Sequence, residues 1–311
     1  MTLRPPLVPA ALLLALAACR GAESVPPQTA FSGAAALAHV KTQLDFGPRI
    51  PGTEGHRRAG DWIVAQMRAT ADTVVVQSWD HVTARGDTLP LRNVLARFRP
   101  ESADRVLYLA HWDTRPTSDE AADPRQRTLP VPGANDGGSG VALLVALAEA
   151  LKATPPSVGV DLLFVDGEDY GDFAANQDVL IGSTYFAEHL PSPDYRPLFG
   201  VLWDMIGDRD LRIPQEPNSV RGAPEVVQRV WGVADALGYG SVFVPEAGVA
   251  VTDDHIPLLN KGLRVIDVID LDYQSPSGEN YHHTPNDTLD KVSASSLQIV
   301  GDVALTLVSG G

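Results

Sequence analysis

The 311-residue sequence contains little cysteine and few basic residues, and each shortage excludes a class of protein. Cys19 is the only cysteine, so no disulfide can form within the chain. Lysine and arginine together number 24 against 39 acidic residues, which gives a formal net charge of −15. Nucleic-acid binding needs clustered basic side chains, and we find no such cluster, so no nucleic-acid partner is expected. A hydrophobic content of 44% with 20% charged residues excludes disorder as the main organisation.

The N-terminal segment has the features of a secretory signal. A short apolar run ends at Ala18, directly before Cys19. The run is too short to span a bilayer, and small residues before a cysteine resemble a bacterial lipobox, in which the cysteine is lipidated. We therefore expect residues 1–18 to be a signal peptide and residues 19–30 a lipidated tether. The protein would then be exported and held at the cell envelope only through Cys19; the alternative is a plain signal peptide that contains a cysteine.

Apolar patterns in the rest of the chain alternate between strand and helix. Continuous apolar runs predict strands that are buried on both faces. The predicted strands are 74–79, 93–98, 106–110, 158–165, 201–206 and 263–269, and the predicted helices are 31–44, 55–69, 139–152, 183–189, 224–237 and 294–308. This alternation predicts one α/β domain over residues 31–311, with three layers (α/β/α) and a mixed, mostly parallel central sheet. Ligands of such sheets bind beyond the carboxyl ends of the strands.

Acidic and imidazole side chains occur at that predicted edge. Most follow a buried strand directly, and Asp204 lies within one. The residues expected to converge there are His111, Asp113, Asp136, Glu168, Asp169, Asp204, Asp270, Asp272 and His283. Carboxylates that lie close together repel one another, and a bound divalent cation removes this repulsion. Histidine together with carboxylates is a ligand set that zinc accepts. The neighbours Glu168 and Asp169 fit a division of labour in which one binds metal and the other stays free as a base.

Each of these elements alone also has an ordinary structural explanation. His111 and Asp113 could form a surface pair, and residues 135–138 have the composition of a common turn. Asp204 within an apolar strand is harder to explain in this way, because a buried carboxylate without a partner is costly. Taken together at the strand ends, the set favours a metal site.

Nine ordered motifs carry a family resemblance that runs from about residue 44 to residue 291. They are 46–49 (FGPR), 110–113 (AHWD), 133–136 (GAND), 164–169 (FVDGED), 177–178 (QD), 185–187 (YFA), 202–207 (LWDMIG), 253–257 (DDHIP) and 283–284 (HT). The chain thereby resembles the zinc-exopeptidase superfamily, in particular the branch that holds glutaminyl-peptide cyclotransferases beside bacterial leucyl-type aminopeptidases.

The resemblance implies a zinc site. It implies Asp136, Asp169 and His283 as ligands of one zinc ion. His111 and Asp204 match positions that bind a second metal in the co-catalytic aminopeptidases, where Asp136 would bridge the two ions.

The resemblance also implies catalytic roles beside the metal. Glu168 matches the general acid/base. Asp204 and Asp253 match carboxylates of a hydrogen-bond network beside the base in the cyclotransferases. Asp113 matches a residue that orients His111.

The chain departs from the family pattern in three places. The acid pair is Glu168-Asp169 rather than two glutamates, and residues 284–291 resemble the aminopeptidases as much as the cyclotransferases. His282 and Ala174 stand where animal cyclotransferases have tryptophans of the substrate pocket. The pocket wall is therefore expected to come from other aromatic residues, namely Trp112, Trp203, Tyr170 or Tyr281.

The residues are compatible with three functions. The first is zinc-dependent cyclisation of N-terminal glutamine to pyroglutamate with release of ammonia, which needs one metal ion. The second is aminopeptidase hydrolysis of peptide N-termini, with water activated between two metals. The third, a non-catalytic binding module, predicts lost ligands and a lost base, whereas all of these positions are filled. Residues 253–257 and the contexts of Gln177 and Asp204 resemble the cyclotransferases more, so cyclisation on peptide or protein N-termini is the prediction.

Overall fold

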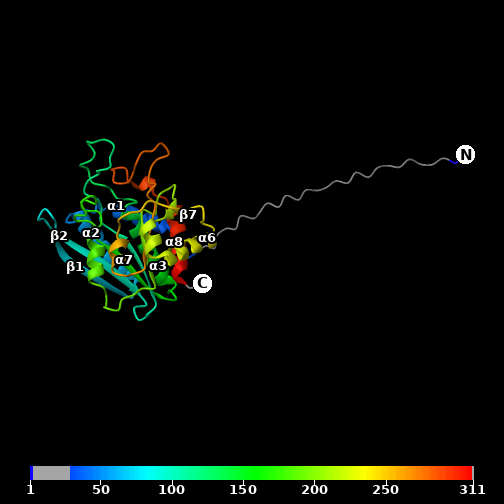
Figure 1. The fold of residues 1–311 in the computed structure, drawn as a ribbon, viewed down its shortest axis with the longest axis horizontal. Coiled ribbons are helices and arrows are strands. Elements are labelled where there is room, and N and C mark those ends of the chain that lie inside the picture. Colours follow the sequence, from blue (N-terminus) through cyan, green and yellow to red (C-terminus); the bar gives the residue numbers. More distant parts are fainter. Residues whose placement is uncertain (3–28, 310–311) are drawn as a thin grey trace.

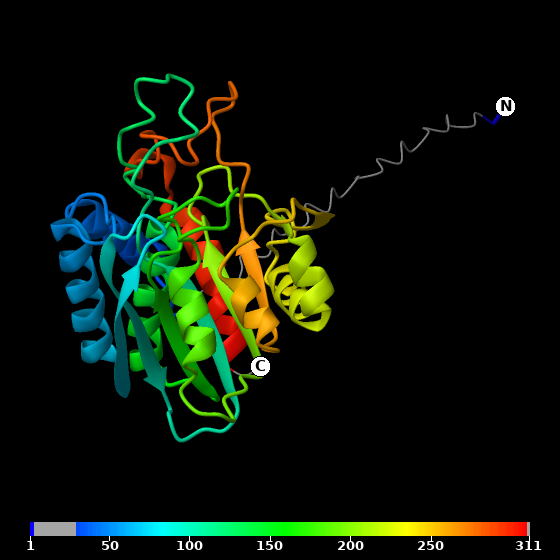
Figure 2. The ribbon, with the colours of Figure 1, turned by 60° about the vertical axis from the view of Figure 1, so that its left-hand side comes forward.

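The computed structural model describes residues 1–2 and 29–309, and it has helices on both faces of a central sheet (Figures 1 and 2). This three-layer arrangement confirms the predicted fold class. The predicted signal peptide and tether, including Cys19, lie almost wholly outside the described residues. Within the described residues, no helix is both long enough and apolar enough to cross a membrane.

The central sheet has six strands and is mostly parallel. Its strands are β1 (Thr73–Val82), β2 (Thr88–Phe98), β3 (Arg105–His111), β4 (Gly159–Val165), β5 (Phe199–Asp204) and β8 (Val265–Ile269). Their order across the sheet is β1-β2-β4-β3-β5-β8. The last four in this order run parallel, whereas β2 pairs antiparallel with both β1 and β4. The carboxyl ends of β4, β3, β5 and β8 therefore meet at one edge.

The helices form two layers of unequal size. One face of the sheet is covered by α1 (Gly33–Leu44), α2 (Glu54–Thr70), α3 (Gly138–Ala153), α6 (Pro224–Ala236) and α8 (Ala294–Ser309), and the other by α4 (Ile181–Glu188) and α7 (His255–Asn260). The remaining short elements are α5 (Pro217–Gly222) beside β8, the two-stranded sheet of β6 (Ile213–Gln215) with β7 (Phe243–Ala247), and the 3₁₀-helix η1 (Leu289–Lys291).

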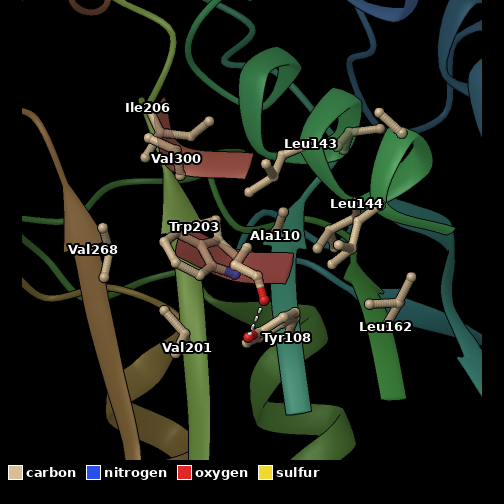
Figure 3. Packing of buried hydrophobic residues seen from close by; sticks show 14 of the residues in the cluster. Tyr108, Ala110, Leu143, Leu144, Leu162, Val201, Trp203, Ile206, Val268 and Val300 are labelled. Carbon is tan, nitrogen blue, oxygen red and sulfur yellow. Dashed lines mark hydrogen bonds between the residues drawn. The ribbon is translucent and has the colours of Figure 1, made fainter. Parts of the chain in front are cut away.

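The side chains of alternate residues in the buried strands pack into two separate hydrophobic cores. In β3, Tyr108 packs in the larger core under α3 and α8, whereas Leu107 and Leu109 pack in the smaller core with Phe186 of α4. Figure 3 shows Tyr108 and Trp203 side by side in the larger core, where the Tyr108 hydroxyl donates a hydrogen bond to the backbone carbonyl of an α8 residue, at 2.8 Å. Because the strands are packed on both faces, their carboxyl ends are held in a fixed position along one edge of the sheet.

One strand differs from its prediction in a way that matters for the site. β5 was expected to run to residue 206 with Asp204 inside it, but it ends at Asp204. The next residue, Met205, has a φ of +49°, which turns the chain out of the strand direction. Asp204 therefore lies at the carboxyl edge of the sheet, in line with the ends of the neighbouring strands.

Candidate metal centre and active site

The carboxyl edge of the sheet brings together the acidic and imidazole residues of the sequence motifs. His111 is the last residue of β3 and Asp204 is the last residue of β5. Glu168 and Asp169 follow β4 closely, and Asp136 stands just before α3. All of these residues are buried. The loops after β3 and β8 project beyond this edge in Figure 2.

Two groups of potential metal ligands share Asp136. In the first group, His283 Nε2 lies 3.4 Å from Asp136 Oδ2 and 3.4 Å from Asp169 Oδ1. In the second group, His111 Nε2 lies 3.1 Å from Asp136 Oδ1 and 3.2 Å from Asp204 Oδ1. The ligand atoms within each group all lie within 4.8 Å of one another. The geometry therefore accommodates one metal ion in either group, or two ions with Asp136 between them.

Buried atoms without hydrogen-bond partners show that a cation fits this centre. Among the described residues, Asp136 Oδ2 and Asp169 Oδ2 are buried acceptors that receive no hydrogen bond. A buried carboxylate oxygen without a donor is costly, and a bound cation removes that cost. One imidazole nitrogen with two carboxylates is a donor set that zinc accepts, with a fourth position left for water or substrate. The residues present thus fit Zn²⁺.

Asp113 supports the backbone of the acid pair. Its two carboxylate oxygens accept hydrogen bonds from the backbone N–H groups of Glu168 (3.0 Å) and Asp169 (3.1 Å). His111 Nδ1 is 3.6 Å from Asp113 Oδ1, which is too long for a hydrogen bond. The residue expected to orient His111 therefore chiefly fixes the turn that carries the base and a metal ligand.

Arg115 contacts a candidate metal ligand directly, and the sequence motifs did not indicate it. Its Nη1 donates to Asp169 Oδ1 at 2.6 Å, while Nε and Nη2 hold the carboxylate of Asp119 at 2.7 and 2.8 Å. Asp169 Oδ1 thus accepts a hydrogen bond from Arg115 on one side and faces His283 Nε2 on the other, while Oδ2 receives no hydrogen bond from the described residues. The only sequence signal is that Arg115 lies two residues after Asp113, which does not reveal a contact with a residue 54 positions away.

Glu168 has the environment of a group that exchanges protons. Burial raises its pKa well above the ordinary value; His111 opposes this shift, and Asp169 and Asp253 add to it. Burial and the neighbouring Asp204 likewise raise the pKa of Asp253, to about 6. A carboxyl group whose pKa is moved toward neutrality can take up and return a proton in one reaction cycle.

The cavity above these residues is small, with a volume of about 150 Å³. Its apolar wall is formed by Phe173, Met205, Val251, Ile269 and Leu271, and its polar wall by Asp136, Glu168, Asp169, Asp204, Asp253, His282 and His283.

The prediction that Trp112 and Trp203 help to form the wall of the substrate pocket is wrong. Trp112 is fully buried and stacks on His56 at 4.3 Å, and Trp203 is fully buried in the larger core. Tyr170 and Tyr281 are partly buried but are not among the cavity residues. The aromatic side chain that lines the cavity is Phe173, directly before Ala174.

His282 is held against the neighbouring His283. The two rings stack with 3.7 Å between their centres, and His282 Nδ1 lies 3.2 Å from Glu120 Oε2. Burial lowers the pKa of His282, but the contact with Glu120 and the charge of Asp136 outweigh it and raise the pKa to about 9. His282 therefore adds positive charge to the wall of an otherwise acidic cavity. Glu120, like Arg115, comes from the loop after β3 and was not indicated by the sequence.

Comparison with known proteins gives the family. A match to peptidase family M28 covers residues 93–308. The chain belongs to peptidase family M28. This assignment confirms the predicted resemblance to the zinc exopeptidases.

Two solved bacterial structures resemble this M28 chain over nearly their whole length. The glutaminyl cyclase of Porphyromonas gingivalis is 37% identical, with a TM-score of 0.85 over 90% of this chain and 98% of that chain. A leucine aminopeptidase precursor from Bacteroides thetaiotaomicron VPI-5482 is 33% identical, with a TM-score of 0.86 over 92% of this chain and 100% of that chain. The fold is thus shared by a cyclase and by a protein described as an aminopeptidase.

The curated relatives are longer than this M28 chain. An aminopeptidase of Bacillus subtilis (strain 168) is 24% identical over 290 residues, which cover 89% of this chain and 57% of that protein. The chain spans less than half the length of the fungal probable zinc metalloproteases that it also matches.

Proposed function

We propose that this M28 protein is a zinc-dependent glutaminyl-peptide cyclotransferase, which converts N-terminal glutamine of peptides to pyroglutamate and releases ammonia. The observation that carries the proposal is the 37% identity to the P. gingivalis glutaminyl cyclase over 98% of that chain. The complete set of buried acids around a small cavity supports it. Asp136, Asp169 and His283 would hold one zinc ion, which when bound supplies a Lewis acid for the side-chain amide carbonyl of the substrate.

Glu168 would move the protons of the cyclisation. As the α-amine nitrogen forms its bond to the side-chain amide carbon, Glu168 takes a proton from that amine. It then delivers a proton to the amide nitrogen, whose bond to carbon breaks so that ammonia leaves. Asp253 lies in the same cavity, and its charge is one of the influences that keep the pKa of Glu168 high.

Aminopeptidase hydrolysis is the second candidate, because the two ligand groups share Asp136. Substitution of His111 by alanine separates the two functions. We expect His111→Ala to retain ammonia release from a glutaminyl peptide, because that reaction uses the Asp136–Asp169–His283 group. Loss of ammonia release in a folded, zinc-loaded His111→Ala protein would show that cyclisation also needs the second ligand group, which would contradict the one-metal mechanism.

We also infer from the sequence that the mature protein is exported and anchored by a lipid at Cys19, the only cysteine. Replacement of Cys19 by serine is expected to move the protein from the membrane fraction of cells to the soluble fraction. Equal distribution of both forms would contradict lipidation.

A further inference from the structure

A second and larger groove opens directly beside the catalytic cavity. Its volume is about 700 Å³, against about 150 Å³ for the catalytic cavity. Phe173 and Thr252 line both spaces, so the groove adjoins the cavity of the proposed reaction.

The groove runs between the two helices that cover the smaller face of the sheet. Thr184, Ala187 and Glu188 line it from α4, and their spacing places them on one side of that helix. Ile256 and Asn260, four residues apart, line it from α7. Both helices lie in front of the sheet in Figure 2. We call this space the α4–α7 groove.

Both helices begin at the catalytic residues and run away from them. The residue before α4, Leu180, donates its backbone N–H to the carbonyl of Glu168 at 3.0 Å. α7 begins two residues after Asp253. The groove therefore leads from the catalytic cavity to Glu188 and Lys261, at the far ends of the two helices. Eight helical residues measure about 12 Å, the length of about three to four residues of extended peptide.

We propose that the α4–α7 groove binds the residues that follow the N-terminal residue of a peptide substrate. The inference rests on the proposed function and deepens it by naming the substrate class, peptides of four or more residues rather than dipeptides. The reaction consumes only the first residue, and the catalytic cavity has little room beyond it. The rest of the peptide must leave that cavity, and the groove is its adjoining exit.

The chemistry of the groove suits a peptide main chain. Asn176 and Asn260 offer side-chain amides, which can both donate to and accept from backbone groups. Within the described part of the chain, Glu188 and Lys261 form no ion pair, so both charges are available to a ligand.

Another groove shares Ile269 and Leu271 with the catalytic cavity, but its polar groups are already engaged. Glu216 accepts hydrogen bonds from backbone N–H groups at the start of α5. Asp270 accepts from the backbone N–H groups of Arg212 and Asp272. This groove is smaller, about 420 Å³, and three of its side chains are acidic against one arginine. The α4–α7 groove is therefore better suited than this groove to bind the peptide.

The test compares a glutaminyl dipeptide with a glutaminyl hexapeptide by ammonia release from the zinc-loaded protein. For the wild type, we expect a KM about tenfold lower for the hexapeptide with a similar kcat, because remote contacts stabilise ground state and transition state alike. Thr184 is exposed and lines the groove, so Thr184→Trp should obstruct the groove beside α4 and remove most of this advantage. Val249 is 68% exposed and lines the other groove, so Val249→Trp is the matched control and should retain the advantage.

The other possible results show whether the inference about the groove or the proposed function is wrong. Equal KM values for the two peptides in the wild type would overturn the inference and leave the proposed function standing. A full advantage in Thr184→Trp, or its loss in Val249→Trp instead, would also overturn the inference. Absence of ammonia from both peptides would overturn the proposed function, and the inference with it.

Discussion

Glu168 is the residue that transfers protons in the proposed reaction. Glu168→Gln keeps the shape of the side chain but removes the group that accepts a proton, so we expect turnover to fall about 10²–10⁴-fold. Zinc content, measured by atomic absorption, should stay near that of the wild type, because Glu168 is not in either candidate ligand group. An active Glu168→Gln protein would contradict the role of Glu168 as the base.

Arg115 should control how tightly zinc is held. Its hydrogen bond to Asp169 Oδ1 keeps that carboxylate in one orientation, and substitutions of residues that orient metal ligands typically cost 10–100-fold in metal affinity. We therefore expect Arg115→Met to weaken zinc binding about tenfold in competition with a chromophoric chelator. Arg264, which is paired with Glu225 at the surface, is the matched control, and Arg264→Met should bind zinc as the wild type does. Equal affinity of the two variants would show that Arg115 does not position Asp169.

The sequence predicts the charged residues of the centre better than it predicts their surroundings. His111, Glu168 and Asp204 could be found because they stand at or just after strand ends, which the topology brings to one edge. Asp136 could be found because it stands in the glycine-rich loop before α3. Arg115 and Glu120 act through contacts with residues distant in sequence, and local patterns do not encode such contacts. The tryptophans were misplaced because a large aromatic residue in or beside a buried strand packs into the core more readily than into a polar cavity.

At the scale of elements, Glu216 connects the short helix α5 to the catalytic segment. It accepts hydrogen bonds from the backbone N–H groups of Asn218 (2.8 Å) and Ser219 (2.6 Å), and from that of Val251 (3.3 Å), two residues before Asp253. Burial alone would raise the pKa of Glu216, but the contact with His255 and the backbone hydrogen bonds lower it to about 2.

This depressed pKa predicts a pH dependence of stability. The folded-state pKa of Glu216 lies below its unfolded-state value of about 4.3, so its stabilisation is present above that value and is lost as the pH falls toward 2. We expect Glu216→Gln to lower the free energy of unfolding at pH 7 by about 1–2 kcal/mol, the usual cost of losing a helix cap. The difference between wild type and variant should shrink between pH 4.5 and 2.5 in urea titrations. A difference that does not change with pH would contradict this account.

Elements with an apolar run or a helical period could be predicted, including the short strands β5 and β8, and short elements without either signal could not. All six strands of the central sheet and the helices α1, α2, α3, α4, α6 and α8 were predicted with shifts at their ends. α5, α7, β6 and β7 have only three to six residues each, which is too few to show a period. α7 matters for function because it follows Asp253 and walls the proposed peptide groove.

At the scale of the whole molecule, zinc should stabilise the fold. Asp136, Glu168, Asp169 and Asp204 are buried together, and a cation at this centre relieves their repulsion only in the folded state. Zinc at a hundred times its Kd stabilises by about 2.7 kcal/mol, which corresponds to a rise in Tm of about 4–5 °C for a chain of this length. Thermal unfolding with EDTA and with added zinc would show this shift, and magnesium should not reproduce it. An unchanged Tm would place zinc outside this centre.

The central claim is cyclisation of N-terminal glutamine, and one measurement tests it most directly. The zinc-loaded protein is incubated with two hexapeptides, one starting with glutamine and the other with leucine, and both are analysed by mass spectrometry. We predict that the glutamine peptide loses the mass of one ammonia molecule and that the leucine peptide is unchanged. Release of free leucine with an intact glutamine peptide would contradict the account and establish an aminopeptidase.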